Sequence, residues 1–146
     1  MDSALDAFER TAVDALLAGD HPVLERLRSQ MATASVRDRE QGEFGRFTDL
    51  WVEADPIDVQ DRFAIDDVYA RVRGVEDEVA LLLHVVRGRL KTLEAFVPRP
   101  VWPDEPELVE TWYVAPDVEE AGQLHRGAER TLTFALRGLT TPREDD

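Results

Sequence analysis

The segment from residue 67 to residue 97 constrains the fold most, because three apolar stretches alternate there with short links that contain glycine. Arg87-Gly88 separates two of these stretches. A two-residue link with glycine is typical of a primed hairpin turn, in which Gly takes a positive φ. The segment is therefore expected to form adjoining antiparallel strands. A turn at this point would pair Val86 with Arg89, Leu83 with Thr92, and Leu81 with Glu94.

A second hairpin around Gly74 completes the predicted register of this segment, pairing Val72 with Val79 and Ala70 with Leu81. Because successive side chains of a strand point to opposite faces, the register predicts one apolar face and one polar, basic face with an apolar centre. The expected core face carries Val68, Ala70, Val72, Val79, Leu81, Leu83, Val85, Leu90 and Phe96. The opposite face is expected to carry Tyr69, Arg71, Arg73, Leu82, His84, Lys91 and Leu93.

Two helices are expected before the sheet. Apolar residues recur at helical spacing from Asp6 to Leu17, and Gly19 lies where such a helix would end. Asp20 is suited to be the N-cap of the second helix, with Pro22 in its first turn. Isolated helices of this length are marginal in water, so their apolar sides need a larger surface. The apolar face of the sheet can supply it.

These elements predict an α+β fold, with an N-terminal antiparallel helix pair packed on one face of an antiparallel β-meander of five to seven strands. A short helix is also expected over residues 117–124 and a last strand over 131–136. Residues 1–140 are expected to form a single α+β domain, with residues 141–146 as a flexible tail. The strands are predicted at residues 35–39, 44–52, 67–73, 79–86, 89–97 and 108–114.

The charge of the chain limits its partners. Its 146 residues include 31 acidic and 17 basic side chains, a net charge of -14. Such a negative field repels phosphate backbones and anionic lipids, so neither nucleic acid nor a membrane is an expected partner. The chain lacks cysteine, has no apolar run long enough to span a membrane, and uses arginine for every base except Lys91. Together these features predict a bacterial, cytoplasmic protein.

Catalytic and metal-binding patterns are weak. The three histidines are far apart in the sequence, and the aspartates at positions 55, 58, 61, 66 and 67 match no ligand pattern and are expected in a solvated loop. No cofactor and no metal are predicted. Glu94 is the exception, because the register places it on the core face. A carboxylate there must be paired, hydrogen-bonded or protonated, and Arg37 or Arg39 could reach it. A structural ion pair and a general acid or base both remain open.

The candidate binding residues are expected on the sheet face opposite the core. Its expected members Tyr69, Arg71, Leu82, His84 and Leu93 combine basic and apolar groups that suit a partner. Trp102 lies in a proline-rich loop, where it could either close the end of the core or serve as a binding residue.

The chain contains LLAGDHPVLERLRSQ from residue 16, Arg39-Glu40, GRFT from residue 45, FAIDDVYARVRG from residue 63, RGRLKTLEAF from residue 87, and Trp102-Pro103. In these stretches the chain resembles a family of small uncharacterised bacterial α+β proteins, of the domain-of-unknown-function type. The resemblance extends over most of residues 8–115. It implies the fold and attaches no activity, cofactor or substrate to the chain.

Two functions are compatible with these features. The first is a non-catalytic protein-binding domain of the bacterial cytosol, for which immunity proteins and antitoxins offer an analogy at the level of fold, and whose partner is another protein or a second copy of this chain. The second is a small enzyme or ligand-binding protein that uses Glu94 and an arginine in a pocket between the helices and the sheet.

Overall fold

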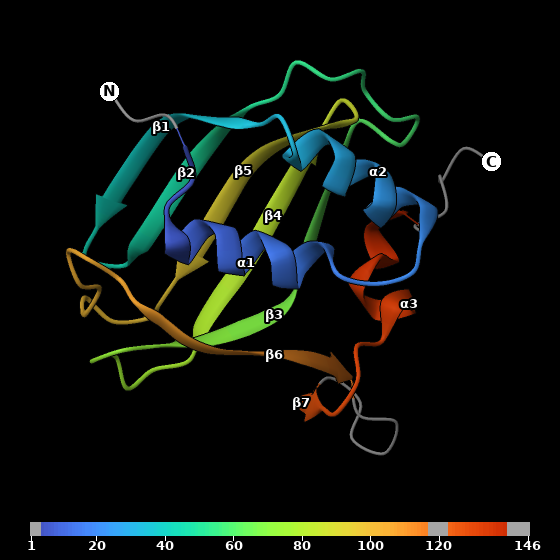
Figure 1. Ribbon diagram of the computed structural model, residues 1–146. Coiled ribbons are helices and arrows are strands. Elements are labelled where there is room, and N and C mark those ends of the chain that lie inside the picture. Colours follow the sequence, from blue (N-terminus) through green and yellow to red (C-terminus); the bar gives the residue numbers. More distant parts are fainter. Residues whose placement is uncertain (1–3, 117–122, 140–146) are drawn as a thin grey trace.

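Helices α1 (Ala7–Leu17) and α2 (Pro22–Met31) run in opposite directions across one face of a seven-stranded antiparallel sheet (Figure 1). The structure is a computed structural model that describes residues 4–116 and 123–139. The predicted α+β class is confirmed. The strands are β1 (Ser35–Gly42), β2 (Gly45–Trp51), β3 (Arg62–Val72), β4 (Val79–Val86), β5 (Arg89–Phe96), β6 (Leu108–Pro116) and β7 (Leu124–Gly127).

Helices α1 and α2 each begin at a side chain that accepts a backbone hydrogen bond. Asp6 caps α1 and forms a capping box with Glu9, in which each side chain accepts from the backbone N–H of the other residue. The N-cap of α2 is His21, whose Nδ1 accepts from the Val23 N–H at 3.1 Å, so the expected cap at Asp20 is wrong by one residue. Pro22 occupies the first turn of α2, as predicted.

The spatial order of the strands is β1-β2-β5-β4-β3-β6-β7, and every neighbouring pair is antiparallel. Two neighbours are not consecutive in the sequence, since β2 pairs with β5 and β3 pairs with β6. The links that follow β2 and β5 therefore cross the ends of other strands. Helix α1 lies over the central strands and contacts β3 and β4 (Figure 1).

The turn at Arg87-Gly88 has positive φ at both residues, 52° and 78°, as a primed hairpin turn requires. Val86 pairs with Arg89, which confirms the predicted start of this hairpin. Glycine is required at position 88, because a Cβ there would lie 2.2 Å from the carbonyl oxygen of Ile57.

A β-bulge at Lys91 shifts the rest of this hairpin by one residue. His84 pairs with Thr92 and Val85 pairs with Leu90, so Lys91 is an extra residue on β5. Every side chain beyond the bulge points to the face opposite the predicted one. Leu93 is buried beneath the helices, whereas Phe96 is 45% exposed. The predictions that Phe96 lies in the core and Leu93 on the opposite face are wrong.

The hairpin between β3 and β4 also differs from the prediction, but the faces are correct. Ala70 pairs with Val79 and Val68 with Leu81, a shift of two residues that leaves each side chain on its expected side. Leu81 and Leu83 are fully buried beneath the helices, as predicted.

The C-terminal segment contains helix α3 (Leu132–Ala135) and a 3-10 turn, η1 (Arg137–Leu139), where a strand was expected over residues 131–136. Most of the helix predicted over residues 117–124 and the whole of the predicted tail at 141–146 lie outside the described residues. Among the helices of residues 4–116 and 123–139, none is long and apolar enough to cross a membrane.

Candidate functional site

The face of the sheet that points away from α1 and α2 contains most of the predicted binding residues. Tyr69, Leu82 and His84 lie there and are partly buried, while Arg71 is exposed. One face of an antiparallel sheet can remain open to water in this way. Leu93 belongs to the opposite face. The open sheet face is defined here as the side of β1–β6 that carries Phe47, Tyr69, Leu82, His84, Glu94 and Phe96.

Glu94 lies on the open sheet face, and its partner is a histidine. Its Oε1 lies 3.2 Å from His84 Nε2, on the neighbouring strand. The Lys91 bulge explains this position, because Glu94 would face the core without it. The expected pairing with Arg37 or Arg39 is wrong: the Arg37 guanidinium lies over the Trp51 ring, 5.4 Å from its centroid, and Arg39 binds another carboxylate. A pocket between helices and sheet with Glu94 inside is therefore excluded by the register.

Polar side chains continue from this pair across β5 to β2. Thr92 Oγ1 donates to Asp49 Oδ1 at 3.2 Å, and Lys91 Nζ lies 3.4 Å from Asp49 Oδ2. Lys91 therefore balances the charge of Asp49 at the centre of the open sheet face, and the centre is polar. An apolar partner would have to bind beside the centre rather than on it.

A hollow of about 710 Å³ lies beside this polar centre, where the hairpin between β1 and β2 meets the end of β5. Phe44, Phe47 and Phe96 line it and are 48%, 50% and 45% exposed. None of the described residues that line it is basic. We call this site the aromatic hollow, and its carboxylates are those of Glu40, Glu43 and Glu94.

Trp102 is not available to a partner, because it closes the end of the core. Its ring packs edge-on against Phe8 of α1 at a centroid distance of 5.6 Å, and its Nε1 donates to Gln41 Oε1 at 2.9 Å. Trp102 as a whole is 8% exposed. Of the two roles considered for Trp102, the structure assigns the closing of the core.

A buried carboxylate on α1, that of Glu9, was not singled out by the sequence analysis. Its side chain is 0% exposed. Arg39 donates to both of its oxygens at 2.6 Å, and Thr48 Oγ1 donates to Oε2 at 2.6 Å. Arg46 Nη1 lies 3.2 Å from the same oxygen and 2.6 Å from Asp6 Oδ2. Glu9 thus fastens α1 to β1 and β2.

Burial raises the pKa of Glu9, but hydrogen bonds from Arg39, Thr48 and the Asp6 N–H outweigh burial and lower the pKa to about 2. The donors around the carboxylate are groups of the protein, on Arg39, Arg46, Thr48 and the backbone of Asp6. The site is closed and ionised, so it is suited to hold α1 in place and not to exchange protons with a substrate.

The low pKa of Glu9 predicts that the free energy of unfolding decreases at acidic pH. The charged form is favoured in the folded protein, so its contribution is present above pH 4.5 and is lost as the pH falls through about 2. The shift corresponds to about 3 kcal/mol of unfolding free energy. Urea unfolding between pH 5 and pH 2 should show this loss in the wild type and not in Glu9→Gln, which cannot ionise. Parallel curves for the two proteins would contradict the prediction.

The aspartates expected in a solvated loop divide into two groups. Asp67 is fully buried and is held by Arg130, and Asp66 contacts Arg137; both lie at an irregularity in β3. Asp55, Asp58 and Asp61 are exposed before β3. Within residues 4–116 and 123–139, no group of three or more acidic or histidine side chains is arranged to hold a metal ion.

Comparisons with protein-family models, with curated proteins and with solved structures find no match to this chain. The aromatic hollow is therefore interpreted from its own geometry and charge.

Proposed function

We propose that this chain is a protein-binding domain and that its aromatic hollow takes a basic protein segment with an apolar side chain at its centre. The observation that carries the proposal is the combination in one hollow of three half-exposed phenylalanines and three carboxylates. Large exposed apolar patches on soluble proteins often mark binding sites.

The phenylalanines define the apolar part of the partner. Phe47 and Phe96 lie on neighbouring strands and Phe44 lies in the hairpin turn, and all three line the hollow, so an inserted side chain has three rings to pack against. Buried aromatic groups near the centre of an interface supply much of its binding free energy. The partner is expected to present a leucine, methionine or aromatic side chain here.

The carboxylates define the charge of the partner. Glu40, Glu43 and Glu94 favour arginine or lysine beside the apolar anchor, and the net charge of -14 attracts a basic protein over longer distances. A second copy of this chain would bring three more carboxylates to the same place if the two hollows met in a symmetric dimer. The charges therefore favour a basic partner over self-association through this surface. Neutralisation of a basic enzyme in the bacterial cytoplasm, as an immunity protein or antitoxin would do, is the wider role in line with this chemistry.

The test uses a random peptide library displayed on phage and selected against the whole chain. Selected peptides are expected to carry an apolar residue flanked by arginine or lysine, and to bind more weakly at high salt. Replacing Phe96 by serine should weaken their binding by at least about tenfold. Val109→Ser is the matched control, because Val109 is 50% exposed on β6 and lies outside the hollow.

Three results would overturn the proposal. The first is a set of selected peptides without basic residues. The second is binding that survives Phe96→Ser, in a variant whose circular dichroism and thermal unfolding match the wild type. The third is a wild-type dimer in sedimentation that Phe96→Ser converts to a monomer, since the hollow would then be occupied by a second copy.

A further inference from the structure

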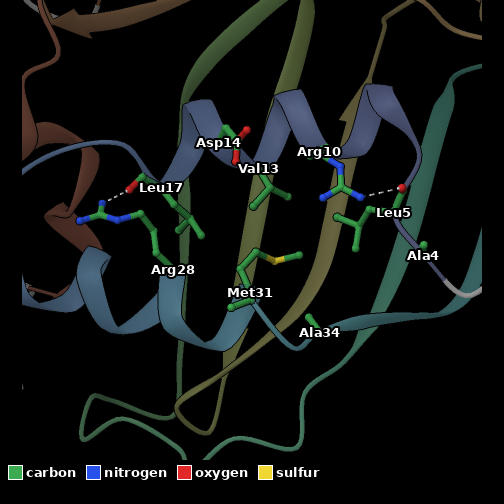
Figure 2. Close-up of a pocket in the computed structure, with 10 residues that line it drawn as sticks. Ala4, Leu5, Arg10, Val13, Asp14, Leu17, Arg28, Met31 and Ala34 are labelled. Atoms are coloured by element: carbon green, nitrogen blue, oxygen red, sulfur yellow. Dashed lines mark hydrogen bonds between the residues drawn. The ribbon is translucent and has the colours of Figure 1, made fainter.

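The groove between α1 and α2 is a second hollow, on the side of the sheet that the two helices cover (Figure 2). Its volume is about 420 Å³, within the usual range for small-molecule sites. Val13 and Leu17 of α1 and Met31 of α2 form its apolar walls, and Leu5 and Ala34 lie at one end. Two turns of α1 border it, a length of about 10 Å.

Two arginines border this apolar groove and have different roles. Arg28 donates to the carbonyl oxygen of Leu17 and, at 3.0 Å, to that of Gly19, so it is held in place at the end of α1. Arg10 lies toward the Leu5 end. Among the described residues its guanidinium makes one hydrogen bond, to the Leu5 carbonyl oxygen at 3.5 Å, the limit for such a bond (Figure 2). Most of its donors can therefore be offered to a ligand.

The charge at the rim of the groove differs from that of the whole chain. The charged residues that line the groove are two arginines, Arg10 and Arg28, and one carboxylate, Asp14. Their formal charges give a local net charge of +1, in a protein whose net charge is -14. The groove combines an apolar floor with the guanidinium of Arg10 at the Leu5 end, while carbonyl oxygens hold Arg28 at the other end. It complements a molecule that has an apolar body and a single anionic head.

We propose that the α1–α2 groove binds a small apolar carboxylate, with its hydrocarbon part along Val13 and Met31 and its carboxylate on Arg10. The ligand enters as a free molecule and not as part of a membrane, because the net charge of the chain opposes approach to an anionic lipid surface. The groove uses neither strand residues nor the aromatic hollow, so this inference does not depend on the proposed protein partner.

The experiment titrates the whole chain with decanoate below its micelle concentration, followed by calorimetry and by amide and methyl chemical shifts. Saturable binding is expected, with the largest shifts at Val13, Met31 and Ala34. Arg10→Gln should weaken binding by about tenfold or more, since a hydrogen bond to a charged group is lost. Arg26→Gln is the matched control, because Arg26 is an exposed arginine of α2 that does not line the groove. Decanol, which lacks the charge, should bind more weakly than decanoate.

The proposal is overturned if decanoate produces no saturable shifts at millimolar concentration, or if Arg10→Gln and Arg26→Gln bind it equally well. A second variant tests the apolar floor: Ala34→Phe narrows the groove and should reduce binding of both decanoate and decanol. Unchanged affinity in Ala34→Phe, with thermal unfolding like that of the wild type, would place the ligand elsewhere and overturn the proposal.

Discussion

Replacing Glu9 by alanine is expected to lower the free energy of unfolding by about 3–5 kcal/mol. The substitution removes the carboxylate that Arg39, Arg46 and Thr48 all contact, and it leaves the Arg46 guanidinium, 7% exposed, with fewer acceptors in the core. The capping box of α1 is lost as well. Denaturant unfolding at neutral pH measures the change.

Glu25→Ala is the matched control for this prediction. Glu25 is also a glutamate in the first turn of a helix, but it is exposed to solvent, so its loss should cost about 0.5 kcal/mol or less. A Glu9→Ala variant as stable as Glu25→Ala would show that the buried ion pairs contribute nothing beyond the burial of apolar groups.

Asp67→Ala is expected to have an effect of similar size, about 3–5 kcal/mol, at the other end of α1. The two Asp67 oxygens accept from Arg130 at 2.7 and 2.9 Å, and Arg130 also donates to the Ala18 carbonyl oxygen at 2.6 Å. Both side chains of the pair are almost fully buried. Without the carboxylate the guanidinium is left in the core without its counter-charge, and the segment before α3 loses its ion pair with β3.

Denaturant unfolding and amide hydrogen exchange measure this second effect, and exchange should accelerate most at Leu136, beside α3. Glu107→Ala is the control, because its ion pair with Arg73 is about two-thirds exposed at both partners and should be worth less than about 1 kcal/mol. Equal losses in Asp67→Ala and Glu107→Ala would contradict the prediction.

Much of the fold could be predicted from local patterns. The alternation of apolar residues identified the strands that became β3, β4 and β5, and the glycine at position 88 identified the turn between two of them. Helical spacing and the proline at position 22 identified α1 and α2. These features depend on residues close together in the sequence, so they can be recognised without knowledge of the tertiary structure.

The error at β5 has a clear cause. The prediction continued a strict alternation from Leu90 to Phe96, whereas the buried residues are Leu90, Leu93 and Ala95. The sequence contained a signal for the bulge, since strict alternation would have buried Thr92 and Glu94 and exposed Leu93. A register that buries the apolar residues requires one extra residue near Lys91. The bulge also changes the candidate site, because Glu94 and Phe96 lie on the open sheet face and not on the core face, where they were predicted.

The sequence alone determined the types and approximate limits of most elements, the hairpin turn at residues 87 and 88, and the acidity that limits possible partners. The tertiary structure decided which carboxylates are buried. Glu9 and Asp67 meet Arg39 and Arg130 across 30 and 63 residues of the sequence. Whether a carboxylate is buried and paired depends on the cations and hydrogen-bond donors that folding brings to it from distant segments of the chain. A pattern of residues close together in the sequence does not contain this information.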